Sequence, residues 1–380
     1  MLDPSVFHRR RNRVLGELTE LAAPALRVAA ALAARRPPSV PATWRRGLII
    51  GHSHMGDVLY RTASLGPLRE LLPRCAWSYL CVPGAAELLE THPAVAEVLP
   101  LVRGEDSWRL AGGAFAELRR RDFDVALCTN TLRHYADLAL ATALGIPNRV
   151  GFDHKGLSGL LTFPVPLEYP SAFPAYFRAM VAAVGGAPGN WPLRPCVFPT
   201  ADDRDAADRC WRALEFDDLP VVACVLTTRQ AHGNWPPSHI IQALRLARAE
   251  RRFGVVLCGG AGDATFLEGA ARDMGGPVRV VAGRLGLRAL AAFLARCAAL
   301  LTLDTGPRHL GNAVGIPVLF ARNLSHSRVE AGAYCDNEVD LAPPLERADD
   351  AAVAAAAAAT PPAAVAAALL DVLAHVHACD

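Results

Sequence analysis

The stretch "GHSHMGDVL", residues 51–59, carries side chains suited to a metal site, a phosphate loop or a general base. His52 and His54 lie two apart, so on extended chain both point to one side and could share a metal ion. A metal site needs about three convergent ligands, however, and no further run of His, Asp or Glu follows nearby. We therefore predict no metal at this stretch.

A phosphate loop is excluded more firmly than a metal site. The spacing G-x-x-x-x-G is present, but Asp57 and Val58 stand where a Walker-type loop needs Lys and Ser or Thr. Asp57 instead precedes a predicted helix over residues 58–72, whose dipole keeps a carboxylate ionised, and Gly56 allows close approach of a substrate. Such a carboxylate can act as a general base, although a helix cap with no further role is the alternative.

The stretch "ALLTLDTGPRHLG", residues 299–311, predicts a strand followed by a helix that begins at Gly306 and Pro307. Proline suits the first helical turn, and Asp304 or Thr305 can cap it. Free N–H groups and the positive end of the helix dipole favour an anion such as a diphosphate. An ordinary capped turn is the alternative. The residues expected around the anion are Asp304, Thr305, Gly306, Pro307, Arg308 and His309.

Two further stretches, "VLTTRQAHGNWPP" and "CGGAGD", also follow apolar runs, and the first of them repeats the pattern of donors. Thr227, Thr228 and Arg229 supply hydroxyl and guanidinium donors that suit phosphate oxygens. Trp235 could close the pocket or simply pack in the core. Asp263 follows a glycine-rich turn and is placed to accept hydrogen bonds from ribose hydroxyls.

Apolar, β-rich runs alternate with amphipathic stretches from Gly47 onward, which is typical of parallel sheets covered by helices on both faces. A region rich in Gly and Pro interrupts the alternation near residue 190, and the pattern then restarts. We predict two doubly wound α/β domains, whose ligands lie beyond the carboxyl ends of the strands. The expected divisions are an extension (1–45), a first domain (46–190), a linker (191–200), a second domain (201–345) and an Ala-rich helical tail (346–380).

The overall composition indicates which partners and which cellular compartment we expect. The formal net charge of +2 gives no overall reason to bind nucleic acid. Ten scattered cysteines without a C-x-x-C pair indicate buried thiols in a reducing compartment. The N-terminus lacks the continuous apolar region of a signal peptide, so we expect a cytoplasmic protein.

The three motifs in this order closely resemble those of glycosyltransferase family 9, the ADP-heptose:lipopolysaccharide heptosyltransferases. They are "SHMGD", "TTRQAHGNWP" and "DTGPRHLGNAVGIPV", and the resemblance extends over roughly residues 46–345. It implies a GT-B fold, in which two Rossmann-like domains face a central crevice. It also implies inverting transfer of a sugar, a heptose in an ADP-linked donor, to a hydroxyl of a lipopolysaccharide core or related glycan, with no obligatory cofactor.

The resemblance also assigns roles to individual residues. Asp57 matches the proposed catalytic base, Asp304 orders its loop, and Asp263 lies near an acidic ribose contact. The positions near the donor diphosphate are Thr227, Thr228, Thr305, Gly306 and His309. This chain departs from the family at "HGN", where a lysine usually precedes Trp-Pro. We expect Arg229, with His232 as the second candidate, to supply the missing positive charge.

Two other functions remain open: a GT-B epimerase or phosphorylase, and a non-catalytic protein that binds a nucleotide sugar. The first 45 residues are a second departure from the family. Arg9, Arg10, Arg11 and Arg13 precede an Ala/Leu-rich helix, which is compatible either with packing or with peripheral contact at the inner face of the inner membrane. In the second case, deletion of residues 1–40 should weaken binding to anionic vesicles and spare transfer to a soluble acceptor.

Overall fold

The computed structural model describes residues 23–51, 54–100, 114–129, 136–153, 158–216, 218–228, 235–324, 326–343 and 359–376. The chain divides into two compact units, residues 1–193 and 194–380. This division falls within the predicted linker, and each unit is described separately.

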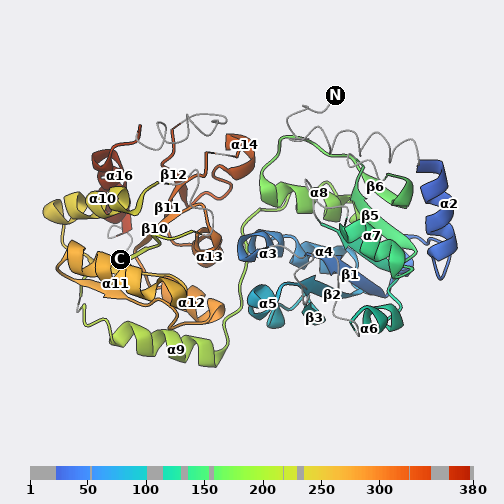
Figure 1. The fold of residues 1–380 in the computed structure, drawn as a ribbon, viewed down its shortest axis with the longest axis horizontal. Coiled ribbons are helices and arrows are strands. Elements are labelled where there is room, and N and C mark those ends of the chain that lie inside the picture. Colours follow the sequence, from blue (N-terminus) through green and yellow to red (C-terminus); the bar gives the residue numbers. More distant parts are fainter. Residues whose placement is uncertain are drawn as a thin grey trace. The chain divides into compact units, whose positions relative to one another are not determined.

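The N-terminal unit alternates strands and helices along almost its whole length (Figure 1). Its strands are β1 (Arg46–Ile50), β2 (Ala76–Cys81), β3 (Glu97–Pro100), β4 (Val125–Cys128), β5 (Asn148–Phe152) and β6 (Phe163–Val165). Its α-helices are α2 (Ala23–Ala33), α3 (Met55–Thr62), α4 (Leu65–Leu71), α5 (Pro83–Glu90), α6 (Ala114–Arg120), α7 (Ala136–Ala143) and α8 (Phe173–Gly185). Two 3-10 turns, η2 (Pro41–Thr43) and η3 (Ser158–Leu160), complete the described elements.

The strands of this unit form a parallel sheet in the order β3-β2-β1-β4-β5-β6. Successive apolar residues of β1 point to opposite faces, so both faces need a helical cover. Ile49 packs with side chains of α3, α4, α5 and α8, whereas Leu48 and Ile50 pack with those of α2, α6 and α7. The result is a doubly wound three-layer unit.

The C-terminal unit repeats the same arrangement. Its strands are β7 (Val221–Cys224), β8 (Gly254–Leu257), β9 (Val278–Val280), β10 (Ala299–Leu303), β11 (Val318–Ala321) and β12 (Glu338–Asp340). Its helices are α9 (Ala201–Arg212), α10 (Pro237–Glu250), η4 (Ala261–Asp263), α11 (Ala264–Met274), α12 (Leu287–Leu294), α13 (Gly306–Val314), α14 (Arg328–Ala331) and α16 (Pro362–Val376). The strand order is β12-β11-β10-β7-β8-β9, and all pairs are parallel.

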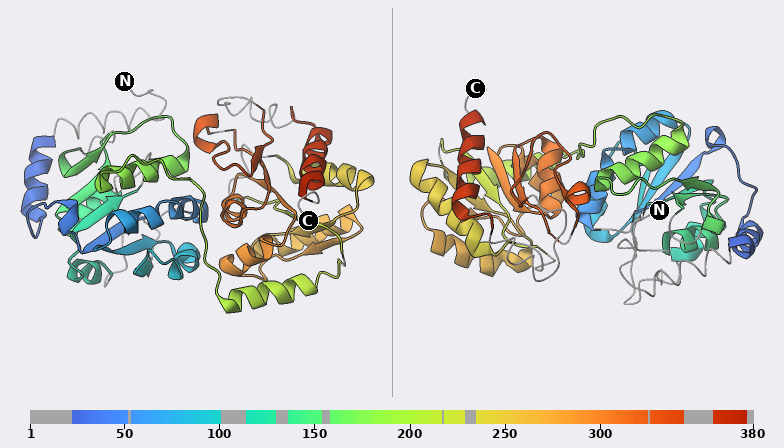
Figure 2. Two further views of the ribbon diagram at one scale, coloured as in Figure 1. Left: turned by 180° about the vertical axis from the view of Figure 1, so that it is seen from behind. Right: turned by 90° about the horizontal axis from the view of Figure 1, so that it is seen from above.

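Helices cover both faces of this second sheet (Figures 1 and 2). One face packs with α10 and α11 and also with α16, whose Val365, Leu369 and Leu373 are fully buried in the same core. On the other face α13 lies directly on the strands, because a Cβ at Gly311 would come within 2.7 Å of Val318. Glycine there lets the helix approach the sheet closely.

The structure confirms the predicted α/β class with two doubly wound parallel sheets. The helix predicted over residues 58–72 is instead two helices, α3 and α4. Pro67 explains the interruption, since it has no N–H to donate to residue 63 and its ring crowds that carbonyl. Of the predicted Ala-rich tail (346–380), residues 346–358 and 377–380 lie outside the described residues. All nine described cysteines are free, and six of them are buried.

Candidate functional site

Both sheets have the strand order 3-2-1-4-5-6 when the strands of each unit are counted from its first. In such sheets the chain leaves the first and fourth strands in opposite directions, which opens a space for a ligand at their carboxyl ends. In the N-terminal unit this point lies between β1 and β4, and in the C-terminal unit between β7 and β10. Asp57 follows β1, while Thr227 and Asp304 follow β7 and β10.

Asp57 lies in the first turn of α3 and is partly buried. Its Oδ2 accepts a hydrogen bond from the backbone N–H of His54 at 3.1 Å, and its Oδ1 accepts one from the Tyr60 hydroxyl at 2.8 Å. A carboxylate has about four lone-pair sites, so these two bonds leave acceptor capacity for a substrate hydroxyl. The geometry is therefore compatible with both the cap and the base that the sequence suggests.

The residue that follows β1, Gly51, lies against the side chain of Tyr79. A Cβ at Gly51 would lie 2.4 Å from the hydroxyl of Tyr79, so only glycine fits at the end of β1. Burial raises the pKa of Tyr79 to about 12, which keeps this hydroxyl neutral. His52 and Ser53 lie outside the described residues, whereas His54 is exposed at the helix N-cap.

Three threonine hydroxyls lie at the carboxyl ends of β7 and β10. The two strands pair with Leu301 opposite Cys224, and this register places Asp304 level with Thr227. Thr227, Thr228 and Thr305 are partly buried, and their hydroxyls have no hydrogen-bond partner within the described part of the chain. These hydroxyls are thus available to a ligand beside the start of α13, where the first N–H groups also lack helical partners.

The residue pair Asp304 and Arg308 belongs to a buried polar network. Arg308 is 1% exposed and donates to Asp304 Oδ1 at 2.9 Å and to Glu338 Oε1 at 2.5 Å. It also donates to the carbonyl oxygens of Ala331 and Gly332. Burial disfavours its charge, but Asp304 and Glu338 outweigh that effect and raise the pKa of Arg308.

The expectation that Arg308 would lie at the diphosphate is therefore wrong. All three guanidinium nitrogens donate hydrogen bonds inside the protein. The side chain therefore stabilises the loop between β10 and α13 and does not face solvent or a ligand. Asp304 accepts a hydrogen bond from this arginine. The side chain of Glu338 is fully buried, but Arg308, Asn312 and the Tyr334 N–H together outweigh the effect of burial, so its pKa is lowered.

His309 is held by a tyrosine on the following segment. Its Nδ1 lies 2.5 Å from the hydroxyl of Tyr334, and the two rings stack at 5.7 Å. Burial raises the pKa of Tyr334 well above its usual range, so the phenol keeps its proton, and in one of the two neutral tautomers of His309 it donates this proton to Nδ1. A neutral His309 then carries its own proton on Nε2, which makes that nitrogen a donor.

Asp263 ends the turn η4 after β8. Its Oδ2 accepts a hydrogen bond from the N–H of Gly260 at 2.8 Å, and its Oδ1 has no partner among the residues that the structure describes. The β7–β8 register places Gly260 level with Thr227, so Asp263 lies at the same edge of the sheet as the threonines. A ribose hydroxyl is a suitable donor for the remaining oxygen.

The segment after Thr228 is described only from Trp235 onward, so Arg229 and His232 lie outside the described residues. Trp235 is 3% exposed and belongs to the core of the C-terminal unit, where its ring packs beside His239. Of its two possible roles, the structure favours packing over closing a pocket.

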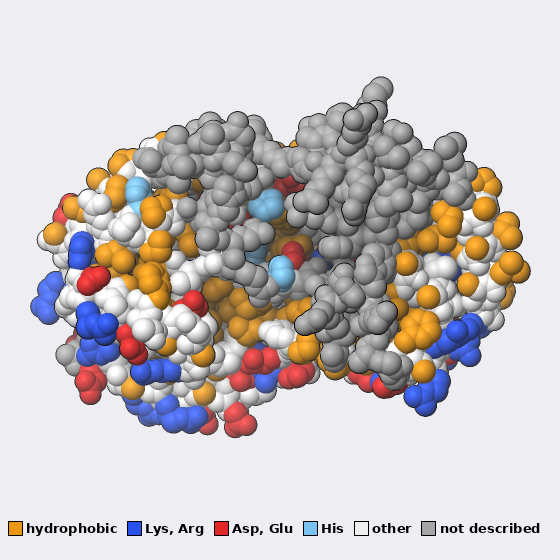
Figure 3. Space-filling view, in the orientation of Figure 1, with side chains coloured by type: hydrophobic (Ala, Val, Ile, Leu, Met, Phe, Trp, Pro, Cys, Tyr) orange, Lys and Arg blue, Asp and Glu red, His pale blue; other side chains and the backbone are white. Residues whose placement is uncertain are grey.

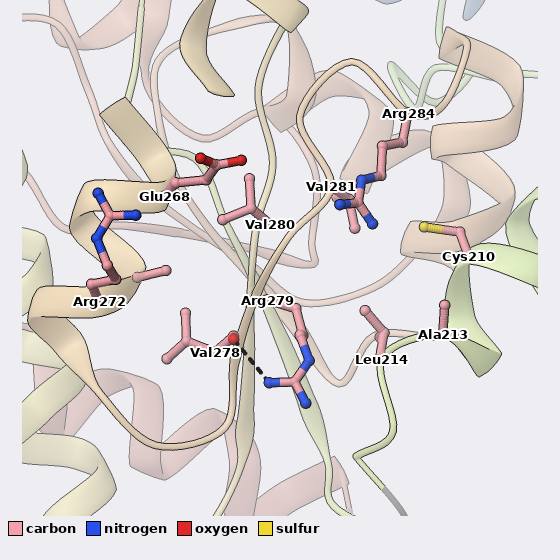
Figure 4. Close-up of a pocket in the computed structure, with 11 residues that line it drawn as sticks. Cys210, Ala213, Leu214, Glu268, Arg272, Val278, Arg279, Val280, Val281 and Arg284 are labelled. Carbon is pink, nitrogen blue, oxygen red and sulfur yellow. Dashed lines mark hydrogen bonds between the residues drawn. The ribbon is translucent and has the colours of Figure 1, made fainter. Parts of the chain in front are cut away.

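Some features lie away from these strand ends. A cavity of about 290 Å³ borders β9, α9 and α11 at the far edge of the sheet, with Arg279 donating to the Val278 carbonyl (Figure 4). It contains no residue of the three motifs.

On the face drawn in Figure 3, acidic and basic side chains of the C-terminal unit are interspersed. Within the described ranges, no group of three His, Cys, Asp or Glu could hold a metal ion.

Sequence reasoning missed Tyr60, Tyr334 and Glu338. Tyr60 could have been found, since a residue three positions after Asp57 lies on the same face of a helix. Tyr334 and Glu338 lie 25 to 30 residues further along the chain than the residues that they contact. No local sequence pattern near those residues indicates these contacts.

Comparison with known proteins then decides the family. The family model described as glycosyltransferase family 9 (heptosyltransferase) matches residues 114–338, more than half of the chain. The chain belongs to glycosyltransferase family 9. Lipopolysaccharide heptosyltransferase 1 of Pseudomonas aeruginosa is 25% identical to this family 9 member over 306 residues, which cover 78% of this chain and 83% of that protein.

Solved structures agree on the fold of this family 9 glycosyltransferase. A family 9 glycosyl transferase from Veillonella parvula has a TM-score of 0.75 at 17% identity, covering 90% of this chain and 99% of that one. The E. coli ADP-heptose heptosyltransferase II has a TM-score of 0.68 at 19% identity, covering 87% and 99%. E. coli heptosyltransferase WaaC with ADP has a TM-score of 0.60 at 21% identity, covering 82% and 98%. These similarities confirm the expected GT-B fold.

Proposed function

We propose that this glycosyltransferase is an inverting enzyme that moves a heptose from an ADP-linked donor to a hydroxyl of a lipopolysaccharide core or related glycan. The names of the related proteins support the donor and acceptor class, because they include lipopolysaccharide heptosyltransferase 1 and WaaC with ADP. Two strand ends carry the proposal: one has a partly exposed carboxylate, and the other has hydroxyls at a helix start that have no hydrogen-bond partner among the described residues.

In the proposed reaction Asp57 accepts the proton of the acceptor hydroxyl, and that oxygen attacks the anomeric carbon from the face opposite the diphosphate. The bond between the anomeric carbon and the diphosphate oxygen breaks, and ADP leaves with the electron pair. General-base assistance contributes roughly 10²–10⁴-fold to such a rate. Asp57 then returns its proton to solvent.

The leaving ADP needs charge compensation, because negative charge develops on its diphosphate in the transition state. The start of α13, the hydroxyls of Thr227, Thr228 and Thr305, and the Nε2–H of His309 would supply donors. Arg229 would add a formal positive charge in place of the family lysine, and Asp263 would accept from the ribose. Gly306 and Pro307 contribute by forming the first turn of the helix.

The test is a transfer assay with a panel of nucleotide sugars, including ADP-heptose, and a deacylated lipopolysaccharide core as acceptor. We expect acceptor-dependent release of ADP and a product whose anomeric configuration, measured by NMR, is inverted. Binding of ADP-heptose by calorimetry without any release of ADP would instead support a non-catalytic binding protein. Epimerised donor or phosphate-dependent turnover would support the epimerase or phosphorylase.

We also propose that α2 contacts an anionic lipid surface on the cytoplasmic side of the membrane. Ala30 packs in the core, whereas Val28 and Leu32 on the outer face are 61% and 83% exposed, and the helix contains no acidic residue. Four arginines precede it at residues 9–13. Exposed apolar residues that follow a basic segment in the sequence favour such an interface. No described helix is long and apolar enough to cross a membrane.

Point variants test this contact better than deletion of residues 1–40, which would also uncover the core around Ala30. We expect the double variant Val28→Ser, Leu32→Ser to sediment several-fold less with phosphatidylglycerol vesicles and to keep its activity on a soluble acceptor. Leu246→Ser, at a residue 40% exposed on α10, is the matched control. Equal sedimentation of the wild type and the double variant would contradict the proposal.

A further inference from the structure

Tyr60 is the one side chain in the described part of α3 that donates a hydrogen bond to Asp57, through its hydroxyl to Oδ1 at 2.8 Å. The other carboxylate oxygen is bonded to the backbone N–H of His54. The two oxygens therefore have different partners, one on the backbone and one on a side chain a turn later. Rotation of the carboxylate would break both bonds at once.

The tyrosine is itself held in place. Its ring is 9% exposed and stacks on Phe173 of α8, with ring centroids 6.4 Å apart and planes 14° from parallel. Burial and the neighbouring Asp57 both raise the pKa of Tyr60 well above its usual range. The phenol is thus protonated at every pH at which a sugar transferase works, and its hydroxyl remains a donor.

We propose that Tyr60 is a positioning residue that fixes the orientation of the Asp57 carboxylate and favours its ionised form. This inference rests on the proposed function, in which Asp57 is the base. A base must lie within hydrogen-bond reach of the proton that it removes, with its free lone pairs directed at the substrate. The bonds from His54 and Tyr60 occupy one lone pair on each oxygen and leave the others in fixed directions.

The surrounding charges set the expected effect on pH dependence. Around Tyr60, Asp57 and Arg61 exert the main charge effects, and Tyr79 on β2 lies behind them. Of the helices packed on α3, α5 carries Glu87 and Glu90, α4 carries Arg69 and Glu70, and α8 carries Arg178. Replacing Tyr60 with Phe changes none of these charges. It removes a donor to the ionised carboxylate, which makes protonation of that carboxylate easier.

The first experiment is the pH profile of kcat/KM for Tyr60→Phe, which keeps the ring and its stacking on Phe173. We expect kcat to fall roughly tenfold, and the acid limb of the profile to move to higher pH, since one hydrogen bond to a charged group is lost. The KM for the donor should not change. Tyr176→Phe, which removes another hydroxyl from the same unit, is the control and should leave the profile in place.

The second experiment does not depend on activity. The titration of the Asp57 carboxyl carbon is followed by ¹³C NMR, with the signal assigned by its loss in Asp57→Asn. A shift of this titration to higher pH in Tyr60→Phe supports the inference even if the wild type transfers no sugar, in which case the proposed function alone fails. An unchanged titration, or an active Tyr60→Phe enzyme with the wild-type profile and turnover, overturns the inference.

Discussion

The starts of α3 and α13 occupy comparable places in the two units but hold their carboxylates in different ways. Each helix follows a central strand of a sheet with the same order. At α3, Asp57 belongs to the helix and accepts bonds from its immediate neighbours, His54 and Tyr60. At α13, Asp304 precedes the helix and is bonded to Arg308, which is buried and tied to Glu338.

This difference shows how one type of strand-to-helix turn can serve two kinds of chemistry. The α3 carboxylate keeps lone pairs for a substrate, so its turn can accept a proton. The carboxylate before α13, that of Asp304, forms a structural ion pair with Arg308. The N–H groups of the turn and the Thr305 hydroxyl therefore remain for an anion. The acid at α3 is thus a candidate reactant, and the acid at α13 is a support.

The largest effect expected from this comparison is on turnover after Asp57→Asn. The amide keeps the shape of the side chain but cannot accept a proton, so kcat should fall by roughly 10²–10⁴. Affinity for the nucleotide-sugar donor, measured by calorimetry, should remain within about twofold, because the residues proposed to bind that donor lie in the other unit. Near-wild-type turnover in the purified variant would remove Asp57 from the reaction.

The second effect is on stability and concerns Arg308→Met. The variant leaves the buried Glu338 without its ionic partner, and breaking a buried pair costs roughly 3–5 kcal/mol. We expect a lower midpoint in urea unfolding and weaker nucleotide binding, whereas Asp57→Asn should unfold almost like the wild type. Arg328→Met, at an exposed arginine on α14, is the control. An unchanged midpoint for Arg308→Met would contradict the structural role.

A smaller effect distinguishes the two candidates for the missing lysine. Arg229→Ala should reduce donor affinity and turnover together, by about tenfold to a hundredfold, because a charge-assisted bond to phosphate is lost. His232→Ala should cost less. If His232 carries the charge instead, wild-type activity declines as pH rises above roughly 7, the range in which histidine loses its proton. If neither variant changes ADP binding, the donor site has been assigned to the wrong turn.

The smallest effect distinguishes the two units by their response to acid. Burial lowers the pKa of His92 to about 4 in the folded N-terminal unit, against 6.5 for the free side chain. Between these values the unfolded chain binds a proton that the folded unit does not, so stability falls as pH drops from 6.5 to 4. The lowered pKa of Glu338 acts later, because its contribution is lost only below its ordinary value of 4.5.

At pH 5 we therefore expect the N-terminal unit to have lost roughly 2 kcal/mol relative to pH 7.5. Urea unfolding at both values measures this difference. His92→Asn keeps an acceptor for the Ala94 N–H and should reduce the loss, whereas His375→Asn, at an exposed histidine, should not. An identical loss in the wild type and His92→Asn would show that His92 is not responsible.

Local chemistry explains which features could be predicted from the sequence. Alternation of apolar runs with amphipathic stretches predicted two doubly wound sheets, because each strand must be buried on both faces. Pro307 and Gly306 predicted where α13 begins, since proline is tolerated in the first turn. The position of Asp57 after β1 followed from the same kind of pattern.

Pairings between distant residues could not be predicted in this way. Arg308 looked like a phosphate ligand because arginine next to a helix start suits an anion, but its partner Glu338 lies 30 residues further on. Tyr334 reaches His309 over 25 residues, with no periodicity to indicate it. Only the folding of β12 beside β11 brings these groups to the loop.

The position of α16 has a consequence for the order in which the protein is made. Val365, Leu369 and Leu373 complete the core formed by β7, β8 and β10, so these strands stay partly uncovered until residue 373 has left the ribosome. The described core residues of the first unit, by contrast, all lie within residues 1–193. Domains generally fold as units during synthesis, and a ribosome stalled near residue 350 would therefore carry a finished first unit and an exposed second sheet, a substrate for chaperones.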